Sequence, residues 1–320
     1  MKVVLAGASG LIGTELTRSL LADGHEVRTL VRRPAARVAG TERPGGAGRS
    51  IEVEWHPELG QFDPAVLRGC DTVICLSGAG VGEHRWTPAY KQELRASRLV
   101  PVSALADALR SLRERGSAAD DGHQSTFVVA SAVGYYGDTG DRWVDERSPA
   151  GRGFLAELCR DWEAAARPAA DAGARVVNLR TGLVLAPAGG LLGRLMPIMR
   201  LGIGGRLGSG RQYMPWISLA DEVSAVRFIL EHAELTGPLN LTGPAPVTNA
   251  EFTGTLARMI HRPAKLPVPA LALRAVLGEF AEDALTGQRA VPAALSQAGF
   301  VFRHPTVESA LRAALAGSRV

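Results

Sequence analysis

The chain opens with Lys2-Val3-Val4-Leu5-Ala6-Gly7-Ala8-Ser9-Gly10-Leu11-Ile12-Gly13, and this stretch decides the fold. The apolar run at 3–6, which contains β-branched residues, predicts a strand that is buried on both faces. Residues 14–22 then recur at helical spacing, and Gly24 is placed to end that helix at its C′ position. A strand, a glycine-rich turn and a helix in this order predict the opening of a dinucleotide-binding βαβ unit.

The three glycines of the turn have separate roles in such a unit. Gly7 makes the tight turn, Gly10 lets the backbone approach a pyrophosphate, and Gly13 lets the helix pack closely against the strand. The anion then lies against free backbone N–H groups at the helix N-terminus. A purely structural turn is the alternative, but the strand before it and the helix after it favour a cofactor site. The expected contacts are Gly7, Ser9, Gly10, Leu11, Ile12 and Gly13.

The end of the second predicted strand, at 25–31, indicates which cofactor binds. Sites that prefer NAD usually carry an acidic residue there, which holds the ribose 2′-hydroxyl. This chain has no acidic residue in 29–34 and continues instead into Arg32 and Arg33. A guanidinium binds a 2′-phosphate through two hydrogen bonds, whereas a carboxylate repels it. We therefore predict NADP(H), with Arg32 as the first phosphate ligand and Arg33 as the second; the alternative is that both arginines are merely solvated.

Composition and charge exclude several classes of protein. The 320 residues suggest about two domains. The net charge of +4, from 36 basic and 32 acidic side chains, is dispersed along the chain and does not indicate a nucleic-acid partner. No apolar run approaches the ~20 residues of a membrane span, and Met1-Lys2 leads directly into the first strand without a signal peptide. The three cysteines form no C-x-x-C pair. We expect a cytoplasmic monomer or homodimer with a small-molecule substrate, and neither nucleic acid nor a membrane as partner.

The rest of the chain continues the alternation of strand and helix. Further strands are expected at 51–55, 71–76, 126–130 and 175–180, with helices between them, as in a doubly wound parallel sheet of the Rossmann type. We therefore predict an α/β fold with an NADP(H)-binding domain over 1–186. The chain is expected to return to this domain at 213–241. Residues 187–212 and 242–320, rich in glycine and proline, are expected to form a smaller substrate-side lobe and C-terminal domain.

Two helix starts and two cofactor contacts follow from local sequence. Thr87 is placed to cap a helix that begins at Pro88, and Asn249 to cap a helix that extends to Ile260. The strand at 71–76 runs into Ser77-Gly78-Ala79-Gly80, where small residues let a cofactor lie against the backbone. Leu76 and Ser77 are therefore expected contacts.

Short motifs along nearly the whole chain match a known family. They are the turn at 7–13, Arg85-Trp86-Thr87 with Ser97-Arg98, the stretch 132–137, Asp161-Trp162-Glu163-Ala164-Ala165, Gly208-Ser209-Gly210 with Pro215-Trp216-Ile217, and Gly287-Gln288-Arg289. By these residues the chain resembles the extended short-chain dehydrogenase/reductases, the NAD-dependent epimerase/dehydratase superfamily. Within it, the chain resembles the epimerase-like group with a short C-terminal domain. The resemblance implies NADP(H) binding, with contacts at Leu76, Ser77, Arg98 and Arg180.

The chain departs from this superfamily at the reaction centre. Active members use a Tyr-x-x-x-Lys pair on the helix after the fifth strand, where the lysine lowers the pKa of the tyrosine and the tyrosine exchanges a proton with substrate. With Glu163 as the anchor of the alignment, these positions fall on Leu155 and Cys159. Neither Tyr nor Lys occurs between Gly137 and Arg180, so no shift of register restores the pair.

Two candidates remain for catalysis, Ser131 and Tyr135. Ser131 ends the fifth strand, where ligands of open α/β sheets gather, and its hydroxyl is expected to orient a substrate oxygen. Tyr135 is expected to donate a proton if its ring points into the cleft; the alternative is that it packs against a helix. For Trp216 and Tyr213 two alternatives remain: they line a substrate pocket, or they pack in the core.

Three functions follow, in order of preference. The first is an NADP(H)-dependent oxidoreductase that acts on a small carbonyl or hydroxyl substrate with a non-standard proton donor. The second is an NADP(H)-binding sensor or partner-binding protein without turnover, which the missing Tyr/Lys pair motivates. The third is a nucleotide-sugar epimerase or dehydratase, which the loss of the tyrosine disfavours more strongly.

Overall fold

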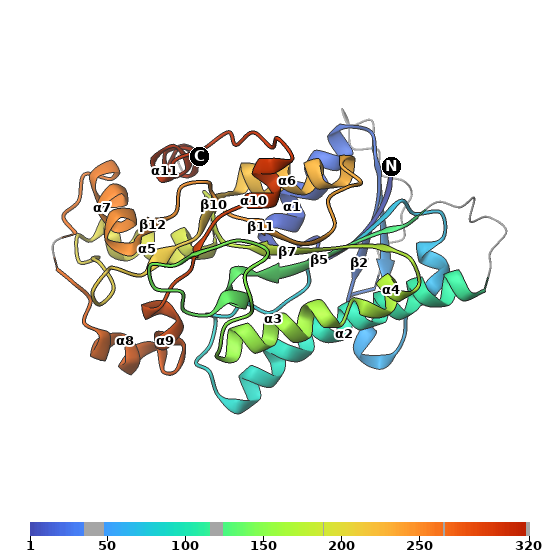
Figure 1. The fold of residues 1–320 in the computed structure, drawn as a ribbon, viewed down its shortest axis with the longest axis horizontal. Coiled ribbons are helices and arrows are strands. Elements are labelled where there is room, and N and C mark those ends of the chain that lie inside the picture. Colours follow the sequence, from blue (N-terminus) through green and yellow to red (C-terminus); the bar gives the residue numbers. More distant parts are fainter. Residues whose placement is uncertain (35–47, 116–123, 188, 265, 318–320) are drawn as a thin grey trace.

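A seven-stranded parallel sheet forms the centre of the molecule (Figure 1). This computed structural model describes residues 1–34, 48–115, 124–187, 189–264 and 266–317. The strand order β11-β7-β5-β4-β1-β2-β3 runs outward in both directions from β1, and every neighbouring pair is parallel, which confirms the doubly wound Rossmann-type sheet. The strands are β1 (Lys2–Ala6), β2 (Glu26–Val31), β3 (Arg49–Glu54), β4 (Thr72–Cys75), β5 (Thr126–Ala132), β7 (Arg175–Thr181) and β11 (Gly237–Leu241).

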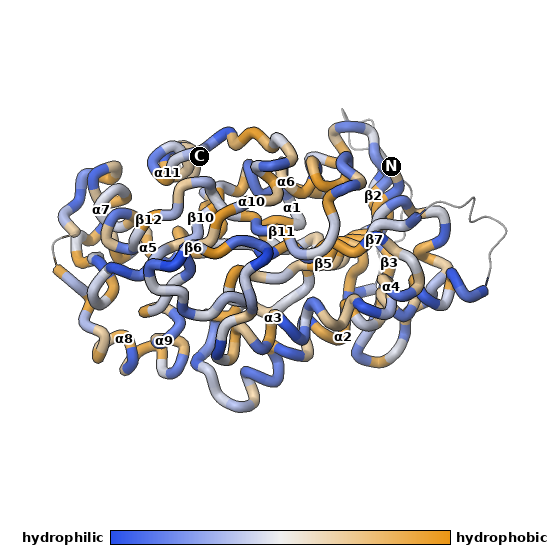
Figure 2. The backbone as a smooth tube through the Cα atoms, in the orientation of Figure 1, coloured by the Kyte–Doolittle hydropathy of each residue, from blue (hydrophilic) through white to orange (hydrophobic). Residues whose placement is uncertain are grey.

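Helices cover both faces of this sheet (Figure 1). One layer holds α1 (Leu11–Ala22), α6 (Leu219–Glu231) and the short α10 (Ala293–Gln297); the other holds α2 (Pro88–Glu114), α3 (Phe154–Ala164) and α4 (Arg167–Asp171). Alternate residues of β1 enter the two cores: Val3 belongs to the cluster under α1 and α6, and Val4 to the cluster under α2. The apolar run is therefore buried on both faces, as predicted, and the strands form the apolar centre of the chain (Figure 2).

A second region lies beside the sheet (Figure 1). Its core joins Leu192, Trp216, Phe252 and Leu311. The region contains the strands β8 (Leu183–Leu185), β9 (Tyr213–Met214), β10 (Trp216–Ser218) and β12 (Val247–Thr248), with the helices α5 (Gly190–Arg200), α7 (Asn249–Met259), α8 (Ala270–Leu277), α9 (Phe280–Leu285) and α11 (Val307–Ala316). Residues 213–218 contain two short strands, β9 and β10, which pair with β12 and β8 respectively.

Two helix caps test the local predictions. The Thr87 hydroxyl accepts a hydrogen bond from the Tyr90 backbone N–H at 3.1 Å, which confirms the predicted start of α2. The cap predicted at Asn249 is wrong, because Thr248 caps α7 in a capping box with Glu251. The Asn249 side chain instead accepts a hydrogen bond from the Leu207 backbone N–H at 2.7 Å, so it ties α7 to the loop before β9.

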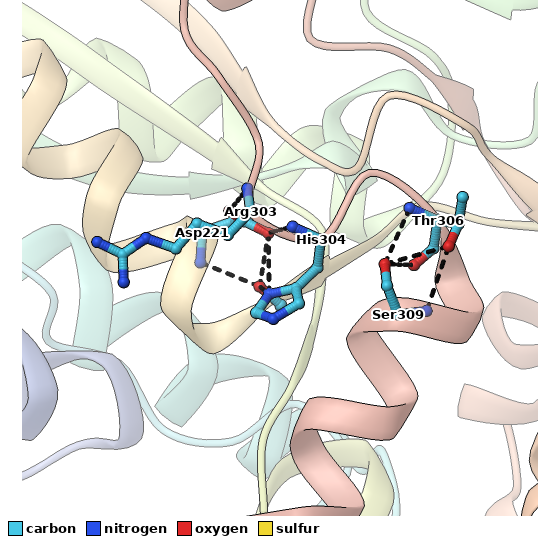
Figure 3. Close-up of polar contacts among 6 residues, drawn as sticks. Asp221, Arg303, His304, Thr306 and Ser309 are labelled. Carbon is cyan, nitrogen blue, oxygen red and sulfur yellow. Dashed lines mark hydrogen bonds and ion pairs between the residues drawn. The ribbon is translucent and has the colours of Figure 1, made fainter.

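The C-terminal part of the chain contacts the sheet domain through β13 and again just before α11. The strand β13 (Arg289–Ala290) pairs with β6 (Trp143–Val144), which follows the short 3-10 helix η3 (Val133–Tyr136). Farther on, the buried Asp221 carboxylate accepts hydrogen bonds from the backbone N–H groups of Arg303 at 2.7 Å and His304 at 3.1 Å (Figure 3). Thr306 and Ser309 then cap α11 reciprocally (Figure 3). No helix in the described ranges is both long and apolar enough to cross a bilayer.

Candidate functional site

The turn after β1 has the geometry that its glycines predict. Gly7 adopts φ +85°, and a Cβ there would lie 2.7 Å from the Leu76 carbonyl carbon. A Cβ on Gly13 would collide with the Gly7 carbonyl oxygen, so α1 packs against the turn only because residue 13 is glycine. Gly10 and Ser9 are exposed at the tip of the turn. The turn therefore presents backbone rather than side chains to a ligand.

The N-terminus of α1 is open to an anion. Gly10 is its N-cap and provides no side-chain hydrogen bond, and no acidic residue lies in the first turn. The backbone N–H groups of Leu11 and Ile12 therefore point outward beside the positive end of the helix dipole. A Cβ on Gly190, at the start of α5, would lie 3.5 Å from the Leu11 side chain, so the second region reaches over this turn. The arrangement fits a pyrophosphate between α1 and α5.

The two arginines after β2 differ in their partners. Arg33 forms an ion pair with Glu52 of β3 at 2.6 Å, and β3 lies next to β2 in the sheet. Arg32 is exposed and makes no hydrogen bond or ion pair within the described ranges. Its guanidinium is therefore available for a phosphate, whereas Arg33 already has an acidic partner.

Side chains of α2 hold the loop that follows β4. Arg98 is buried, with 8% of its surface exposed, and donates to the Ala79 carbonyl at 2.8 Å; Ser97 accepts from the Ala79 N–H at 3.0 Å. Burial lowers the pKa of Arg98. Leu76 and Ser77, both half-buried, begin this loop. Arg98 thus fixes the loop on which Leu76 and Ser77 lie, rather than extending its guanidinium into solvent.

On the face of the sheet that α3 covers, Ser131 and Arg180 share one carboxylate. The Ser131 hydroxyl donates to Glu163 Oε1 at 2.8 Å, and Arg180 donates to both oxygens of Glu163 at 2.8 and 2.9 Å. Arg180 is 3% exposed. Burial opposes its charge, but the hydrogen bonds and the charge of Glu163 raise the pKa of Arg180 above its ordinary value. Both predicted site residues therefore belong to one buried, charge-balanced cluster.

The tyrosine pair after β5 completes this cluster. The Arg180 guanidinium lies 3.4 Å from the centre of the Tyr135 ring and donates to the Tyr136 hydroxyl at 3.0 Å. Tyr136 in turn donates to Asn240 of β11 at 2.7 Å, and burial raises its pKa to about 12. Tyr135 is half-buried, and its hydroxyl has no hydrogen-bond partner among the residues that the structure describes. Its ring is stacked on an arginine, which is the packing alternative to a proton donor.

An open depression of about 580 Å³ lies beside Tyr135. Arg160, Glu163, Ala164 and Arg167 line it from α3 and α4, together with Asp161. These residues belong to the helical layer on one face of the sheet, whereas the glycine turn lies at the carboxyl end of β1. The depression and the glycine turn are separate features of the molecule.

The positions of the missing Tyr/Lys pair lie where the alignment put them. A Cβ on Gly134, just after β5, would meet Leu155 at 3.2 Å and the Cys159 sulfur at 3.9 Å. Burial, followed by the charge of Glu163, raises the pKa of the Cys159 thiol to about 11. Leu155 packs against the buried apolar cluster of Trp86, Tyr90, Leu94 and Leu158. The end of β5 is therefore bordered by a neutral thiol and an apolar cluster instead of an acid/base pair.

A second buried carboxyl lies on the opposite face of β7. Glu222 of α6 is fully buried, and its Oε1 accepts a hydrogen bond from the Thr181 hydroxyl at 2.9 Å. Its Oε2 has no partner within the described ranges. Burial raises the pKa of Glu222 to about 8, although the Thr181 hydrogen bond opposes the shift. Neither residue was singled out by sequence reasoning, since an acid in the first turn of a helix usually serves the helix dipole.

Trp216 belongs to the core rather than to a pocket. It is 1% exposed and donates through Nε1 to the Ala245 carbonyl at 3.1 Å. A Cβ on Gly243 would lie 2.6 Å from its ring, so the two strand ends are in direct contact. Tyr213 is half-buried, with the Arg289 guanidinium 4.5 Å from its ring centre.

Comparisons with known proteins agree with this architecture. The family model described as the NAD dependent epimerase/dehydratase family matches residues 3–241, and a domain of unknown function, DUF1731, matches residues 268–314. An epimerase family protein of Mycobacterium bovis is 51% identical over 97% of this chain and 96% of its own. The chloroplastic SDR39U1 homolog of Arabidopsis thaliana is 35% identical over 98% of this chain and 86% of its own.

A solved structure extends the likeness to three dimensions. The crystal structure of the human epimerase family protein SDR39U1 with NADPH superposes with a TM-score of 0.84 at 32% identity, and the match covers 99% of each chain. The family model covers the sheet domain with its glycine turn, and the relatives cover the C-terminal domain as well. The motifs along the sequence, the doubly wound sheet and these matches agree, and the chain belongs to the NAD dependent epimerase/dehydratase family, among the epimerase family proteins that carry a C-terminal DUF1731 domain.

Proposed function

We propose that this chain is an NADP(H)-dependent oxidoreductase that exchanges hydride between the nicotinamide and a small carbonyl or hydroxyl substrate. The observation that carries the proposal is the open N-terminus of α1 behind the glycine turn, together with the exposed guanidinium of Arg32, which has no partner among the described residues. The first accommodates a pyrophosphate and the second a 2′-phosphate. The human relative, solved with NADPH, supports the same coenzyme.

The residues of the chain divide the work of binding. The turn at 7–13 cradles the pyrophosphate through backbone N–H groups, and Arg32 selects the phosphorylated ribose. Ser97 and Arg98 hold the loop of Leu76 and Ser77 in place against the adenosine side. The bound coenzyme supplies the hydride. The Ser131 hydroxyl donates its hydrogen bond to Glu163 in this structure. To orient the substrate oxygen, it has to donate that hydrogen bond to the substrate instead.

The side chains beside the carboxyl end of β5 suggest the type of substrate. Leu155 borders the end of β5 and packs, as Phe154 and Phe280 do, against a buried apolar cluster. That cluster consists of Trp86, Tyr90, Leu94 and Leu158. An apolar wall favours a substrate with a hydrophobic body and one polar oxygen. We therefore propose a small apolar carbonyl compound, or the corresponding alcohol, over a charged sugar nucleotide. We also keep a cytoplasmic location and a monomeric or homodimeric state as part of the proposal.

Coenzyme selection tests the proposal directly. Titration of the protein with NADPH, followed by calorimetry, should give clear binding, and NADH should bind more weakly. Arg32→Ala should lower the affinity for NADPH about 10- to 100-fold and leave the affinity for NADH unchanged. Arg18→Ala, which removes an exposed arginine of α1 paired only with Glu15, is the matched control. Equal loss of affinity for both coenzymes would refute the role of Arg32, and no heat with either would refute the function.

A second candidate is an NADP(H)-binding protein without turnover. The observation that favours it is the pair of Leu155 and Cys159 at the positions of the usual acid and base, with a thiol whose pKa is raised to about 11. Oxidation of NADPH in the presence of a panel of apolar aldehydes and ketones separates the two candidates. Turnover above background supports the oxidoreductase, and tight binding without turnover on any of them supports the sensor.

A further inference from the structure

Glu222 is a buried acid for which neither the fold nor the binding function has a use. It lies in the first turn of α6, where the helix cap is already made by Ser218, whose side chain accepts from the Asp221 N–H. Of its two oxygens, only Oε1 has a partner, the Thr181 hydroxyl. A buried carboxyl with an unpaired oxygen costs free energy of folding. Such a group persists most readily when it has a role in binding or chemistry.

The place of Glu222 in the fold is next to the proposed coenzyme cleft. Its partner Thr181 is the last residue of β7 and lies in register with Ala132 and Leu241, the last residues of β5 and β11. In open α/β sheets, ligands bind outside these carboxyl ends. Leu219, the first residue of α6, packs on the same buried cluster as Ala8 of the glycine turn. Glu222 is therefore hydrogen-bonded to the strand end of β7, and its helix begins on the same core cluster that the glycine turn contacts.

Among the residues that the structure describes, no basic side chain pairs with Glu222. The His304 imidazole contacts the neighbouring acid instead, with its Nδ1 3.4 Å from Asp221 Oδ2. The strands β8 and β10, which pack against α6, carry no acidic or basic side chain. Arg180 of β7 is bound to Glu163 on the other face, and Asp221 is held by Ser218 and by the Arg303 and His304 backbone. The charged groups near the rest of α6 pair with one another, Arg18 with Glu15 on α1 and Arg227 with Asp23 and Glu231.

A cation that arrives at the strand ends would therefore change the protonation of this acid. Burial raises the pKa of Glu222 to about 8, so the carboxyl is mostly protonated at neutral pH. The nicotinamide ring carries a positive charge in its oxidised form and none in its reduced form. In a site of low dielectric, a positive charge nearby favours the carboxylate. The Thr181 hydroxyl, half-buried at the end of β7, connects the acid to the cleft.

We propose that Glu222 is the group that balances the charge of the nicotinamide, and that it gives up its proton when the oxidised coenzyme occupies the cleft. This inference rests on the proposed binding of NADP(H). During reduction of a carbonyl compound, hydride leaves NADPH and a proton is also consumed. The proton lost by Glu222 accounts for it: NADPH, the carbonyl and the protonated acid become NADP⁺, the alcohol and the carboxylate.

Proton counting by calorimetry tests the inference without any substrate. NADP⁺ and NADPH are titrated separately into the whole protein at about pH 7, in two buffers that differ in their enthalpy of ionisation. The dependence of the binding enthalpy on the buffer gives the number of protons released. The phosphates are common to both coenzymes, so the difference between the two isolates the charge of the ring. We expect about one more proton released with NADP⁺ than with NADPH.

Variants assign the proton to its source. Glu222→Gln keeps the shape and the neutral charge of the protonated acid, so the protein should fold and bind both coenzymes, and the difference in proton release should vanish. Thr181→Val is a second variant, which should leave the difference in place at equilibrium because the acid itself remains. Glu231→Gln, at the exposed end of the same helix, is the matched control and should behave as the unchanged protein.

The possible outcomes separate the role of Glu222 from the proposed binding of NADP(H). Equal proton release with both coenzymes in the unchanged protein would overturn the role of Glu222 while binding stands. A difference that survives in Glu222→Gln would overturn it as well. Absence of binding by either coenzyme would overturn the proposed function and this inference together.

Discussion

Arg180 and Thr181 are consecutive residues of β7 that point to opposite faces of the sheet. Each holds a carboxyl, Arg180 the half-buried Glu163 and Thr181 the fully buried Glu222. On one face, Glu163 receives two hydrogen bonds from Arg180 and one from Ser131. On the other face, Glu222 receives one from Thr181 and leaves an oxygen unpaired. The comparison shows that burial alone does not fix the state of an acid. A paired guanidinium keeps Glu163 in a charge-balanced cluster, while a single hydroxyl leaves Glu222 with a raised pKa.

The largest effect on stability is expected from breaking the ion pair between Glu163 and Arg180. Glu163→Leu leaves the Arg180 guanidinium buried without its acid, and it should lower the free energy of unfolding by about 3–5 kcal/mol, as measured by urea denaturation. The double variant Glu163→Leu with Arg180→Met removes both charges and should recover part of the loss. If the double variant is no more stable than the single one, the charge on Arg180 is not the cause.

A smaller and pH-dependent effect is expected on the unpaired side. The pKa of Glu222 in the folded protein, about 8, lies above the ordinary value of 4.5. Its contribution to stability is therefore fully present below pH 4.5 and is lost as the pH rises toward 8. Glu222→Gln cannot ionise, so its advantage over the unchanged protein should grow across this range, to on the order of 4 kcal/mol at most. Thermal unfolding at a series of pH values measures it; a constant difference would contradict the raised pKa.

The smallest effects on stability are expected from removal of the Thr181 and Ser131 hydroxyls. Thr181→Val removes the only hydrogen bond to Glu222 and should cost about 1–3 kcal/mol, because the carboxyl is then left without any partner. Ser131→Ala removes one of three bonds to Glu163 and should cost less, about 1 kcal/mol, since Arg180 remains. Denaturation of both variants under one condition provides the test. Equal costs would mean that the two acids do not differ in how well they are satisfied.

Much of the frame of the site could be predicted from local sequence. The glycine turn, the open start of α1 and the cap at Thr87 depend on residues that are neighbours in the chain, and the structure has all three. The positions of Leu155 and Cys159 beside the end of β5 also follow from helical spacing and one anchor residue. Local periodicity encodes which segments become strands and helices, because side-chain burial repeats with the period of each element.

Partners across the sheet could not be predicted in the same way. That Glu52 pairs with Arg33 rather than with Arg32 depends on the register of β2 and β3. That Ser131 and Arg180 meet over Glu163 depends on how α3 lies across β5 and β7. Nothing in the spacing of 131, 163 and 180 states which of these side chains share a face, so their roles as cofactor or substrate contacts remain predictions.

The sequence by itself determined a nucleotide-binding turn, its helix and the alternating strands around them, since these require only neighbouring residues of the right size and shape. The tertiary structure decided which charges are balanced. It placed Glu163 against a guanidinium and Glu222 against a single hydroxyl, although both acids lie on helices and both meet β7. The reason is physical: the energy of a buried charge depends on the groups within a few ångströms in space, and those groups come from segments far apart in the chain.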